Sequence, residues 1–361
     1  MFGKKSIIIM AFVAVVFLVV SAVTSVDTAS ADSEFSVTDS TGQTYTFSSP
    51  VDHIVTLGYG FTITVVESGC ADKIVGIDKY SKYSYTNDER MEVLNNVIVV
   101  GTGYTSDSDN ILANMVQLVD SGKFDIDSDV IILNNFTSTL SSGGLRDVLV
   151  DYGFKVLCYG ATSYDEVVSI VEDMAKLLGS EKCSSLASQM TYVKEYIAKV
   201  LEDNNITDVT DAVYVSYSSS VIKIGNTGSL AVDYIISAGG NNSGEDSSKA
   251  SPTYASEAPA LLQMGVSVIL LDGNYDGTAD HFCNDVLHTT DITVWKMEKS
   301  WNSYGTDALD GLWAVAGYLY PDLFDGPVPD NSSSSDNTLY YVIAGVVIAA
   351  VVLLAVYIIK R

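Results

Sequence analysis

The sequence predicts an α/β protein in which two Rossmann-like lobes are joined by a long α-helix. The first observation is a central stretch, 163–204, whose apolar residues recur at helical spacing in two consecutive runs. The second is that strand-like apolar runs alternate with shorter helical runs on both sides of this stretch. The third is that 361 residues are enough for two domains with full cores.

Start and stop signals bound the two central helices. Ser163 followed by Glu166 forms a capping-box pattern, in which the hydroxyl and the carboxylate each accept from a backbone amide of the other residue. Gly179 suits the end of the first helix, and Ser180 suits the cap of the second. The second helix then extends to Asn204 and is roughly 35 Å long.

Strands and helices alternate in both flanking halves of the chain. In the first half we expect a hairpin at 35–47, strands at 54–57, 74–77, 97–100, 130–133 and 155–158, and helices at 59–68 and 145–152. In the second half we expect strands at 212–217, 221–224, 266–271 and 292–295, and helices at 230–237, 257–264 and 306–319.

The two ends of the chain are unlike the rest. Lys4 and Lys5, an apolar run at 7–23 and the small residues before Asp32 predict a secretory signal, with an uncleaved anchor as the alternative. The uncharged run 339–359 predicts a transmembrane helix, and the basic tail after it predicts a cytoplasmic end. The expected parts are a signal peptide (1–31), an N-terminal lobe (32–162), a linking helical segment (163–204), a C-terminal lobe (205–325), a flexible stalk (326–338), a transmembrane helix (339–359) and a cytoplasmic tail (360–361).

The chain is strongly acidic, with 19 basic and 45 acidic residues and a formal net charge of −26. Such a field repels phosphate backbones and anionic lipid headgroups, so a nucleic-acid partner is excluded. Apolar residues make up 47% of the chain against 18% charged, which predicts a folded protein rather than an acidic tail. Four scattered cysteines leave one or two disulfides and free buried thiols both open.

Motifs of catalysis are weak. Gly58 and Gly60 follow a strand, but Ile63 stands where a dinucleotide fingerprint needs glycine. His281, Asp285 and His288 could share a helical face with Cys283 nearby, although a solvated helix face explains that spacing better than a metal site does. We therefore expect no enzyme activity, no catalytic residue, no metal site and no cofactor.

Aromatic residues are concentrated where predicted strands end. In open α/β sheets, ligands bind beyond the carboxyl ends of the strands, and aromatic rings there offer apolar faces with a polar tip. The set predicts a cleft for a flat or bulky organic ligand between the lobes. We expect its lining to include Tyr59, Tyr80, Tyr104 and Phe136 from the first lobe and Tyr217, Trp295 and Trp301 from the second.

Six segments form an ordered set over about 36–325. They are IVTLG (54–58), ESGCADKIVGIDKYS (67–81), DVIIL (129–133), IISAGGN (235–241), SVILL (267–271) and LWAVAGYLYPDLF (312–324). In this order they resemble the iron-siderophore and vitamin B12 (class III) substrate-binding proteins of ABC importers, although proline is missing from both of the family's paired "PD.VI" strands and 104–129 holds an apparent insertion.

The resemblance implies a fold of two α/β lobes joined by one long helix, and a function. It implies a monomeric binding protein, tethered outside the cell membrane by its own C-terminal helix, that captures a metal chelate and delivers it to an ABC permease and its ATPase. Ferric siderophore, haem and corrinoid all remain open as the chelate. A surface adhesion or structural module is the alternative, and an enzyme on this scaffold is a third.

In the family an acidic residue on each lobe docks on the permease. Glu257 lies in the helix before the second-lobe "VI" strand and matches the pattern there. The first-lobe acid has no clear counterpart, and Asp109 is its candidate. Across such an interface a carboxylate would pair with an arginine of the permease and guide association.

Overall fold

The computed structural model describes residues 34–249 and 251–331. The first lobe contains a five-stranded parallel sheet in the order β5-β4-β3-β6-β7. The order runs outward in both directions from β3, which is the doubly wound arrangement that places a crevice beyond the carboxyl ends of the strands. These strands are β3 (Ile54–Leu57), β4 (Ile74–Asp78), β5 (Ile98–Gly101), β6 (Val130–Asn134) and β7 (Val156–Tyr159).

Both faces of this sheet are buried, because successive side chains of each strand point to opposite faces. Ile132 packs with Ile63 and Val167 on one face, whereas Ile131 packs with Met115 and Leu149 on the other. The helices of the first lobe are α2 (Tyr59–Glu67), α3 (Lys79–Tyr83), α4 (Ser108–Asp120), α5 (Thr137–Leu140) and α6 (Leu145–Tyr152), with short 3-10 turns at Ala71–Lys73, Glu89–Leu94 and Thr105–Asp107.

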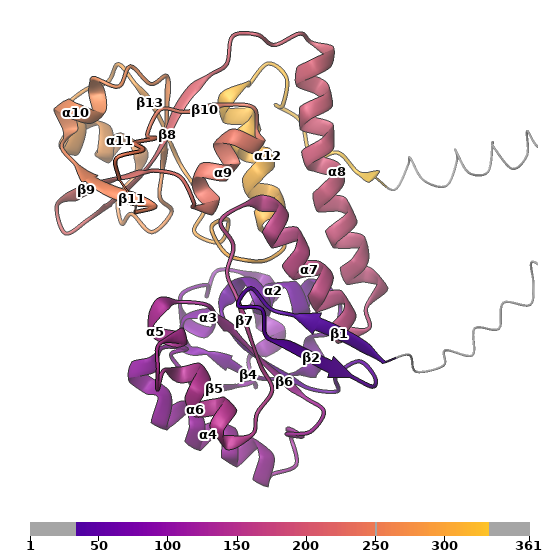
Figure 1. Cartoon of the computed structure of the whole chain (residues 1–361). Coiled ribbons are helices and arrows are strands. Elements are labelled where there is room, and N and C mark those ends of the chain that lie inside the picture. Colours follow the sequence, from indigo (N-terminus) through magenta and orange to yellow (C-terminus); the bar gives the residue numbers. More distant parts are fainter. Residues whose placement is uncertain (1–33, 250, 332–361) are drawn as a thin grey trace, which may run out of the picture.

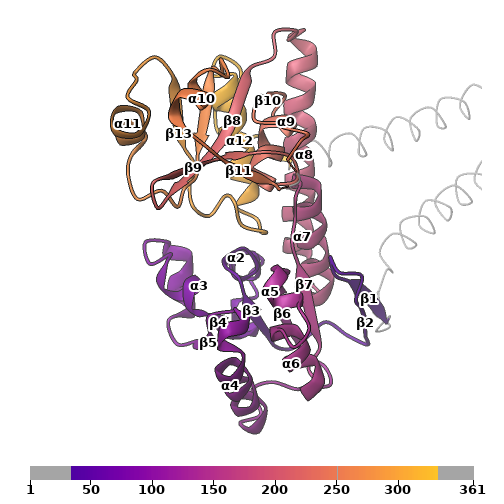
Figure 2. The same ribbon diagram turned by 60° about the vertical axis from the view of Figure 1, so that its left-hand side comes forward.

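The central stretch forms two antiparallel helices, α7 (Tyr164–Leu178) and α8 (Glu181–Asp203). The predicted capping box of Ser163 and Glu166 is present, Gly179 ends α7 with a left-handed backbone, and the Ser180 hydroxyl caps α8. Figures 1 and 2 show α8 running alongside both lobes. The element that links the lobes is therefore the one that its start and stop signals predicted.

The second lobe contains a six-stranded mixed sheet in the order β11-β9-β8-β12-β13, with β10 beside β8. Strands β8, β12 and β13 are parallel, while β9 turns back on β8 through Ser219 and Ser220, whose positive φ angles of 50° and 61° suit a two-residue hairpin. The strands are β8 (Asp211–Ser218), β9 (Val221–Gly225), β10 (Asn241–Asn242), β11 (Thr253–Ser256), β12 (Val268–Leu271) and β13 (Thr293–Lys296). The helices are α9 (Leu230–Ser237), α10 (Ala258–Leu262), α11 (Ala279–His281) with a π-helical turn at Phe282–Leu287, and α12 (Ala308–Leu319).

A single hydrophobic core extends through both lobes. Ile132 and Leu157 of the first sheet and Leu270 of the second belong to one cluster of buried residues, together with Met190 and Ile197 of α8. Burying such side chains stabilises a fold by about 1.5–3 kcal/mol each, so α8 holds the lobes as parts of one packed body. We therefore expect only a small closing motion between them.

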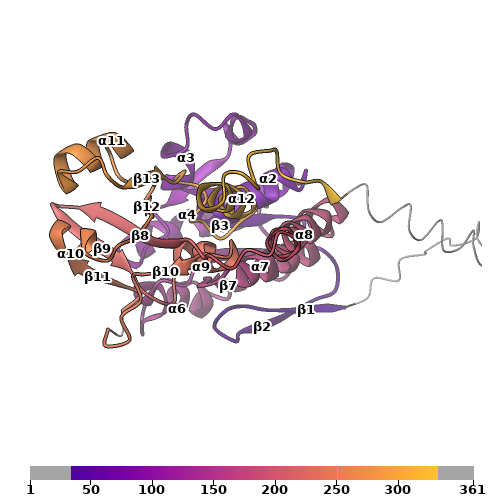
Figure 3. The same ribbon diagram turned by 90° about the horizontal axis from the view of Figure 1, so that it is seen from above.

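The remaining pieces lie on the side of α7 and α8. The hairpin of β1 (Phe35–Thr38) and β2 (Thr44–Phe47) packs beside α7, as Figure 3 shows from above. At the other end of the described chain, the backbone amide of Asn331 donates to the Gln189 side chain of α8 at 3.0 Å. Both ends of the described chain thus leave from the α8 side (Figure 1).

The α/β fold with parallel strands is confirmed. The predicted signal peptide and transmembrane helix lie outside the described residues, and no helix within 34–249 and 251–331 has the length and apolar character needed to span a bilayer.

All four cysteines are free thiols in the structure. Burial raises the pKa of the Cys158 thiol to about 12 and that of Cys183 to about 11, so neither is a ready thiolate.

Candidate binding cleft

Two adjoining cavities lie between the lobes. The first, which we call the hairpin-side chamber, has a volume of about 700 Å³ and extends from β1 and α7 to the start of α9. The second, the strand-end chamber, has a volume of about 200 Å³ and lies over the carboxyl ends of the first-lobe strands. Asn302 and Tyr304 of the second lobe line both chambers. Together they form an interlobe cleft of the size that ligand pockets have.

The topology of the first sheet gathers the lining of the strand-end chamber. Gly58, Asp78, Thr102 and Asn134 each lie at or just beyond the carboxyl end of a neighbouring strand. The Asp78 carboxylate caps α3 by accepting from the backbone amides of Tyr80 and Ser81. Burial raises the pKa of the Asp78 carboxyl above its ordinary value. This cap fixes the helix that carries the Tyr80 ring to the chamber.

Three of the predicted aromatic residues form a continuous row along this chamber. Tyr80 meets Tyr104 edge-on with ring centroids 5.7 Å apart, and Tyr104 stacks on Phe136 at 5.5 Å with an angle of 14°. Their exposed fractions are 48%, 38% and 38%, so the row presents ring surface that no protein atom covers. Exposed rings that touch one another in a cavity can stack on a bulky organic ligand.

Tyr59 also lines the strand-end chamber, but its position serves the fold. It is 7% exposed and stacks on Tyr85 with ring centroids 3.5 Å apart. Its hydroxyl donates to Asp88 at 2.5 Å and to Asp307 of the second lobe at 3.3 Å. Burial raises the pKa of Tyr59 far above its usual value and that of Tyr85 to about 12, so both stay protonated.

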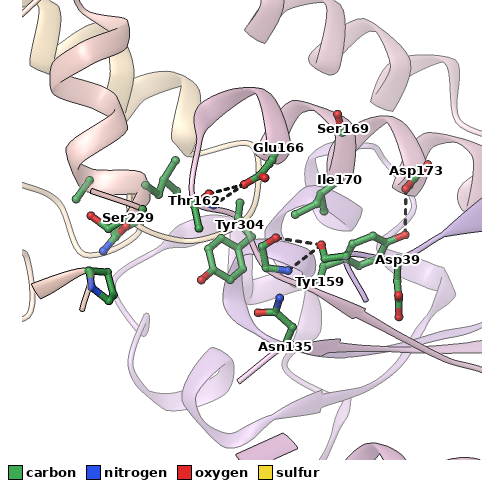
Figure 4. Close-up of a pocket in the computed structure, with 18 of the residues that line it drawn as sticks. Asp39, Asn135, Tyr159, Thr162, Glu166, Ser169, Ile170, Asp173, Ser229 and Tyr304 are labelled. Atoms are coloured by element: carbon green, nitrogen blue, oxygen red, sulfur yellow. Dashed lines mark hydrogen bonds between the residues drawn. The ribbon is translucent and has the colours of Figure 1, made fainter. Parts of the chain in front are cut away.

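The hairpin-side chamber is bounded by one face of α7 (Figure 4). Glu166, Ser169 and Asp173 lie along that face, and Tyr159, Asn135 and Tyr304 lie opposite. The Glu166 carboxylate accepts from the backbone amide of Thr162 at 2.6 Å and from its hydroxyl at 3.0 Å. These bonds lower the pKa of Glu166 below its ordinary value, and the bond from the Thr162 amide has the largest effect.

The predicted second-lobe aromatic residues lie elsewhere than in the two chambers. Trp295 stands on the edge strand β13 and stacks on Tyr318 of α12 at 4.4 Å and 3°. Trp301 is packed against the shared core, and its carbonyl accepts from the Tyr234 hydroxyl. Tyr217 packs edge-on against Tyr275 and Phe282 on the far face of the second sheet. None of the three is among the residues that line either chamber in the described part of the chain.

Other second-lobe residues, which we did not predict as ligand-binding, line the cleft instead. Asn302, Tyr304 and Tyr214 line the cleft, together with Ser229 at the start of α9. Tyr304 was detectable as an aromatic residue beyond a strand end, but its contact with Phe61 at 6.4 Å depends on how the lobes pack. The Tyr214 hydroxyl donates to Asp272 at 2.6 Å, an interaction between neighbouring strands that spacing along the chain does not reveal.

The remaining predicted residues are on the surface. Glu257 is exposed at the N-cap position of α10, and no side-chain capping bond holds its carboxylate. Asp109 is exposed in the first turn of α4. His281 approaches Asp285 at 3.6 Å, but the described residues contain no group of three potential ligands placed to hold a metal ion.

No family model matches the chain, and no curated protein matches it in sequence. Solved structures do match. Helicobacter pylori CeuE with Ni(II) bound has a TM-score of 0.63 at 18% identity, over 81% of this chain and 91% of its own. A periplasmic heme-binding protein from Pseudomonas aeruginosa has a TM-score of 0.58 at 14% identity, over 76% and 94%. The periplasmic vitamin B12-binding protein BtuF of Vibrio cholerae has a TM-score of 0.54 at 18% identity, over 75% and 97%.

The chain therefore has the fold of the periplasmic binding proteins for metal, haem and vitamin B12. The resemblance to the iron-siderophore and vitamin B12 class is confirmed at the level of the fold. Each match spans nine-tenths or more of the solved chain, so the likeness includes both lobes and the linking helices rather than one lobe alone.

Proposed function

We propose that this chain is the substrate-binding protein of an ABC importer, that it captures a metal chelate in the interlobe cleft, and that it delivers the chelate to the permease. The observation that carries the proposal is the row of exposed rings formed by Tyr80, Tyr104 and Phe136 inside a cavity between two lobes. Proteins of the same fold are described as binding Ni(II), haem and vitamin B12, which supports binding rather than catalysis as the role of this cleft.

We further propose that the protein works outside the cell membrane and is held there by 339–359. The support is that run of uncharged residues followed by Lys360 and Arg361. The described chain ends at Asn331 beside α8, whereas Tyr80 lies in α3 and Phe136 directly before α5, on the other side of the first lobe from α8 (Figure 1), so a tether there leaves the cleft accessible. The test is fractionation: the full chain is expected with membranes, and residues 32–330, made without either end, are expected to form a soluble monomer.

Binding is tested by titrating the soluble form with three chelates, namely a ferric siderophore, haemin and cobalamin. Stacking and burial against several rings support dissociation constants between about 1 µM and 1 nM. At least one chelate is expected to bind in that range and to quench tryptophan fluorescence. If none binds more tightly than about 100 µM, where only ~5.5 kcal/mol remains, the metal-chelate proposal fails and an adhesion role takes precedence.

A further inference from the structure

The charged residues that line the two chambers all carry the same sign. Apart from tyrosine, each ionisable side chain in the lining is a carboxylate: Asp39, Glu166 and Asp173 in the hairpin-side chamber and Asp78 in the strand-end chamber. The other polar lining groups are neutral amides and hydroxyls, such as those of Asn302 and Ser229. A ligand in the hairpin-side chamber therefore meets three carboxylates and neutral hydrogen-bonding groups, whereas Asp78 of the strand-end chamber is buried and burial raises its pKa.

Hydrogen bonds to neighbouring groups hold each carboxylate of the hairpin-side chamber in place. Asp39 accepts from the amides of Thr41, Gln43 and Cys158 and from the Thr41 hydroxyl. Glu166 accepts hydrogen bonds from Thr162 and Ser163, and these bonds favour its charged form. Asp173 accepts from the Tyr159 hydroxyl at 3.3 Å and from Lys176 at 2.8 Å. Lys176 itself lines a groove on the outer side of α7 and α8 rather than the cleft.

Two cations of an adjoining recess, Arg90 and Lys299, already have partners in the protein. Arg90 lies in an adjoining recess of about 350 Å³ that is lined by Tyr59, Tyr85 and Lys299. Its guanidinium donates to Glu67 at 2.5 Å, to Asp88 at 2.8 Å and to Asp307 at 2.7 Å, so three carboxylates surround one positive charge. Lys299 lies over the Tyr85 ring at 5.3 Å. An anionic ligand that approached Arg90 would compete with these three carboxylates for its N–H donors.

We propose that the cleft selects chelates whose outer surface is neutral or positively charged and discriminates against those that carry several carboxylates or phenolates. This inference rests on the proposed function, and it narrows the substrate class of the same site. Like charges repel strongly beside low-dielectric protein walls, and such repulsion is an effective means of rejecting a competing ligand of similar size. The aromatic row then supplies attraction that does not depend on the sign of the ligand.

The first experiment compares ligands of opposite or different charge in two pairs, of which the corrinoid pair shares one scaffold and the siderophore pair does not. The probes are cyanocobalamin against its monocarboxylate, in which one side-chain amide is hydrolysed, and cationic ferrioxamine B against the anionic ferric tricatecholate enterobactin. The anionic member is expected to bind at least tenfold more weakly in whichever pair binds. Equal or tighter binding of the anionic member, or binding of haemin alone, overturns the charge inference and leaves the proposed function intact. Failure of every probe, haemin included, overturns the proposed function itself.

The second experiment adds one positive charge to the cleft wall. Ser169→Lys places an ammonium on the exposed face of α7 between Glu166 and Asp173, and Ser184→Lys places the same charge on the outer groove of α8. Both serines are exposed, and each hydroxyl donates to the carbonyl four residues before it, so the two changes are matched locally.

Ser169→Lys is expected to weaken binding of the cationic chelate about fivefold and to strengthen binding of the anionic one. Ser184→Lys is expected to change neither affinity. A uniform loss for both ligands in Ser169→Lys would indicate steric blocking and would overturn the inference. Equal shifts in the two variants would attribute the effect to overall charge and would overturn it as well.

Discussion

Arg90 of the first lobe and Asp307 of the second form a bidentate ion pair, with Nη1 to Oδ1 at 2.7 Å and Nη2 to Oδ2 at 3.0 Å. The two residues are 217 positions apart in the chain. Tyr59 donates to the same carboxylate, and the backbone amide of Thr306 donates to the Thr64 hydroxyl of α2 at 3.2 Å. Polar contacts therefore reinforce the apolar core that joins the lobes.

Loss of the Arg90 charge is expected to destabilise the protein. Asp307 is only 4% exposed, so Arg90→Met leaves a nearly buried carboxylate without its main counter-ion. Because Arg90 itself is partly exposed, we expect the free energy of unfolding in urea to fall by about 2 kcal/mol, less than for a fully buried pair. The matched control is Lys199→Met, which breaks an exposed pair with Asp203 and is expected to leave the urea midpoint unchanged. Equal midpoints for both variants would contradict an interlobe role for Arg90.

The same cluster predicts a pH dependence through Asp88. Burial acts to raise the pKa of Asp88, but bonds from Arg90 and Tyr59 outweigh it and lower the pKa below the ordinary value. A carboxyl with a lowered folded-state pKa contributes stability that is fully present above the unfolded value of about 3.9 and is lost as pH falls through the folded value.

The wild type is therefore expected to exceed Asp88→Asn in unfolding free energy by a constant amount above about pH 5, and this difference should shrink below about pH 4. Urea titrations at a series of pH values measure it. Ser188→Ala, an exposed change on α8 that removes no ionisable group, is the control and should show no such trend. A difference that grows on acidification would have the wrong sign for a lowered pKa.

The lobes also touch through two glycines. A Cβ on Gly305 would collide with the Gly60 carbonyl, and one on Gly60 would lie 2.7 Å from the Tyr304 amide. Gly305→Ala is thus expected to force the lobes apart and to lower the unfolding free energy by about 2 kcal/mol or more. Gly326→Ala has open space around it and is the control. If the two variants melt at the same temperature, this backbone contact is absent in solution.

The elements that the sequence predicted well are those that depend on local signals. Ser163, Glu166 and Gly179 fix the ends of α7 by bonds within a few residues, so their pattern is readable without the fold. Tyr80, Tyr104 and Phe136 were placed together because the carboxyl ends of parallel strands share one sheet edge.

The second-lobe residues that we predicted for the cleft do not line either chamber, and the reason is physical. Trp295 lies on an edge strand, and whether its ring faces the cleft or α12 depends on strand register and sheet order rather than on spacing. Tyr304 enters the cleft only because the loop after β13 packs on α2 of the other lobe. Such contacts between distant segments have no signature in a single sequence.

Charge reversal at Glu257 is expected to impair transport without affecting ligand binding. Its carboxylate is exposed and makes no capping bond, so Glu257→Lys removes no contact that the fold needs. A docking acid acts mainly on the association rate with the permease, so transport should fall severalfold, most at low salt. Uptake assays in cells and chelate titration of the purified variant separate the two effects.

Asp109→Lys tests the first lobe in the same way. Glu202→Lys on α8 is the control for both variants. Loss of chelate binding in Glu257→Lys would place that residue in the cleft or the fold.

Removal of rings from the aromatic row is expected to weaken chelate binding while the fold persists. Tyr104 and Phe136 are each 38% exposed, so Tyr104→Ala and Phe136→Ala expose little buried surface to water. Each stacking contact contributes about 1 kcal/mol, which predicts roughly fivefold weaker binding per variant. Because the two rings stack on each other, the double variant is expected to lose less than the sum of the single losses.

Trp295→Ala is the decisive comparison for this row. Its ring stacks on Tyr318 and does not line either chamber, so chelate affinity should match the wild type although the fluorescence signal decreases. Calorimetry therefore measures the affinity of all four variants on one scale. If Trp295→Ala weakens binding and Tyr104→Ala does not, the ligand binds beside α12 of the second lobe, and the strand-end chamber is not the binding site.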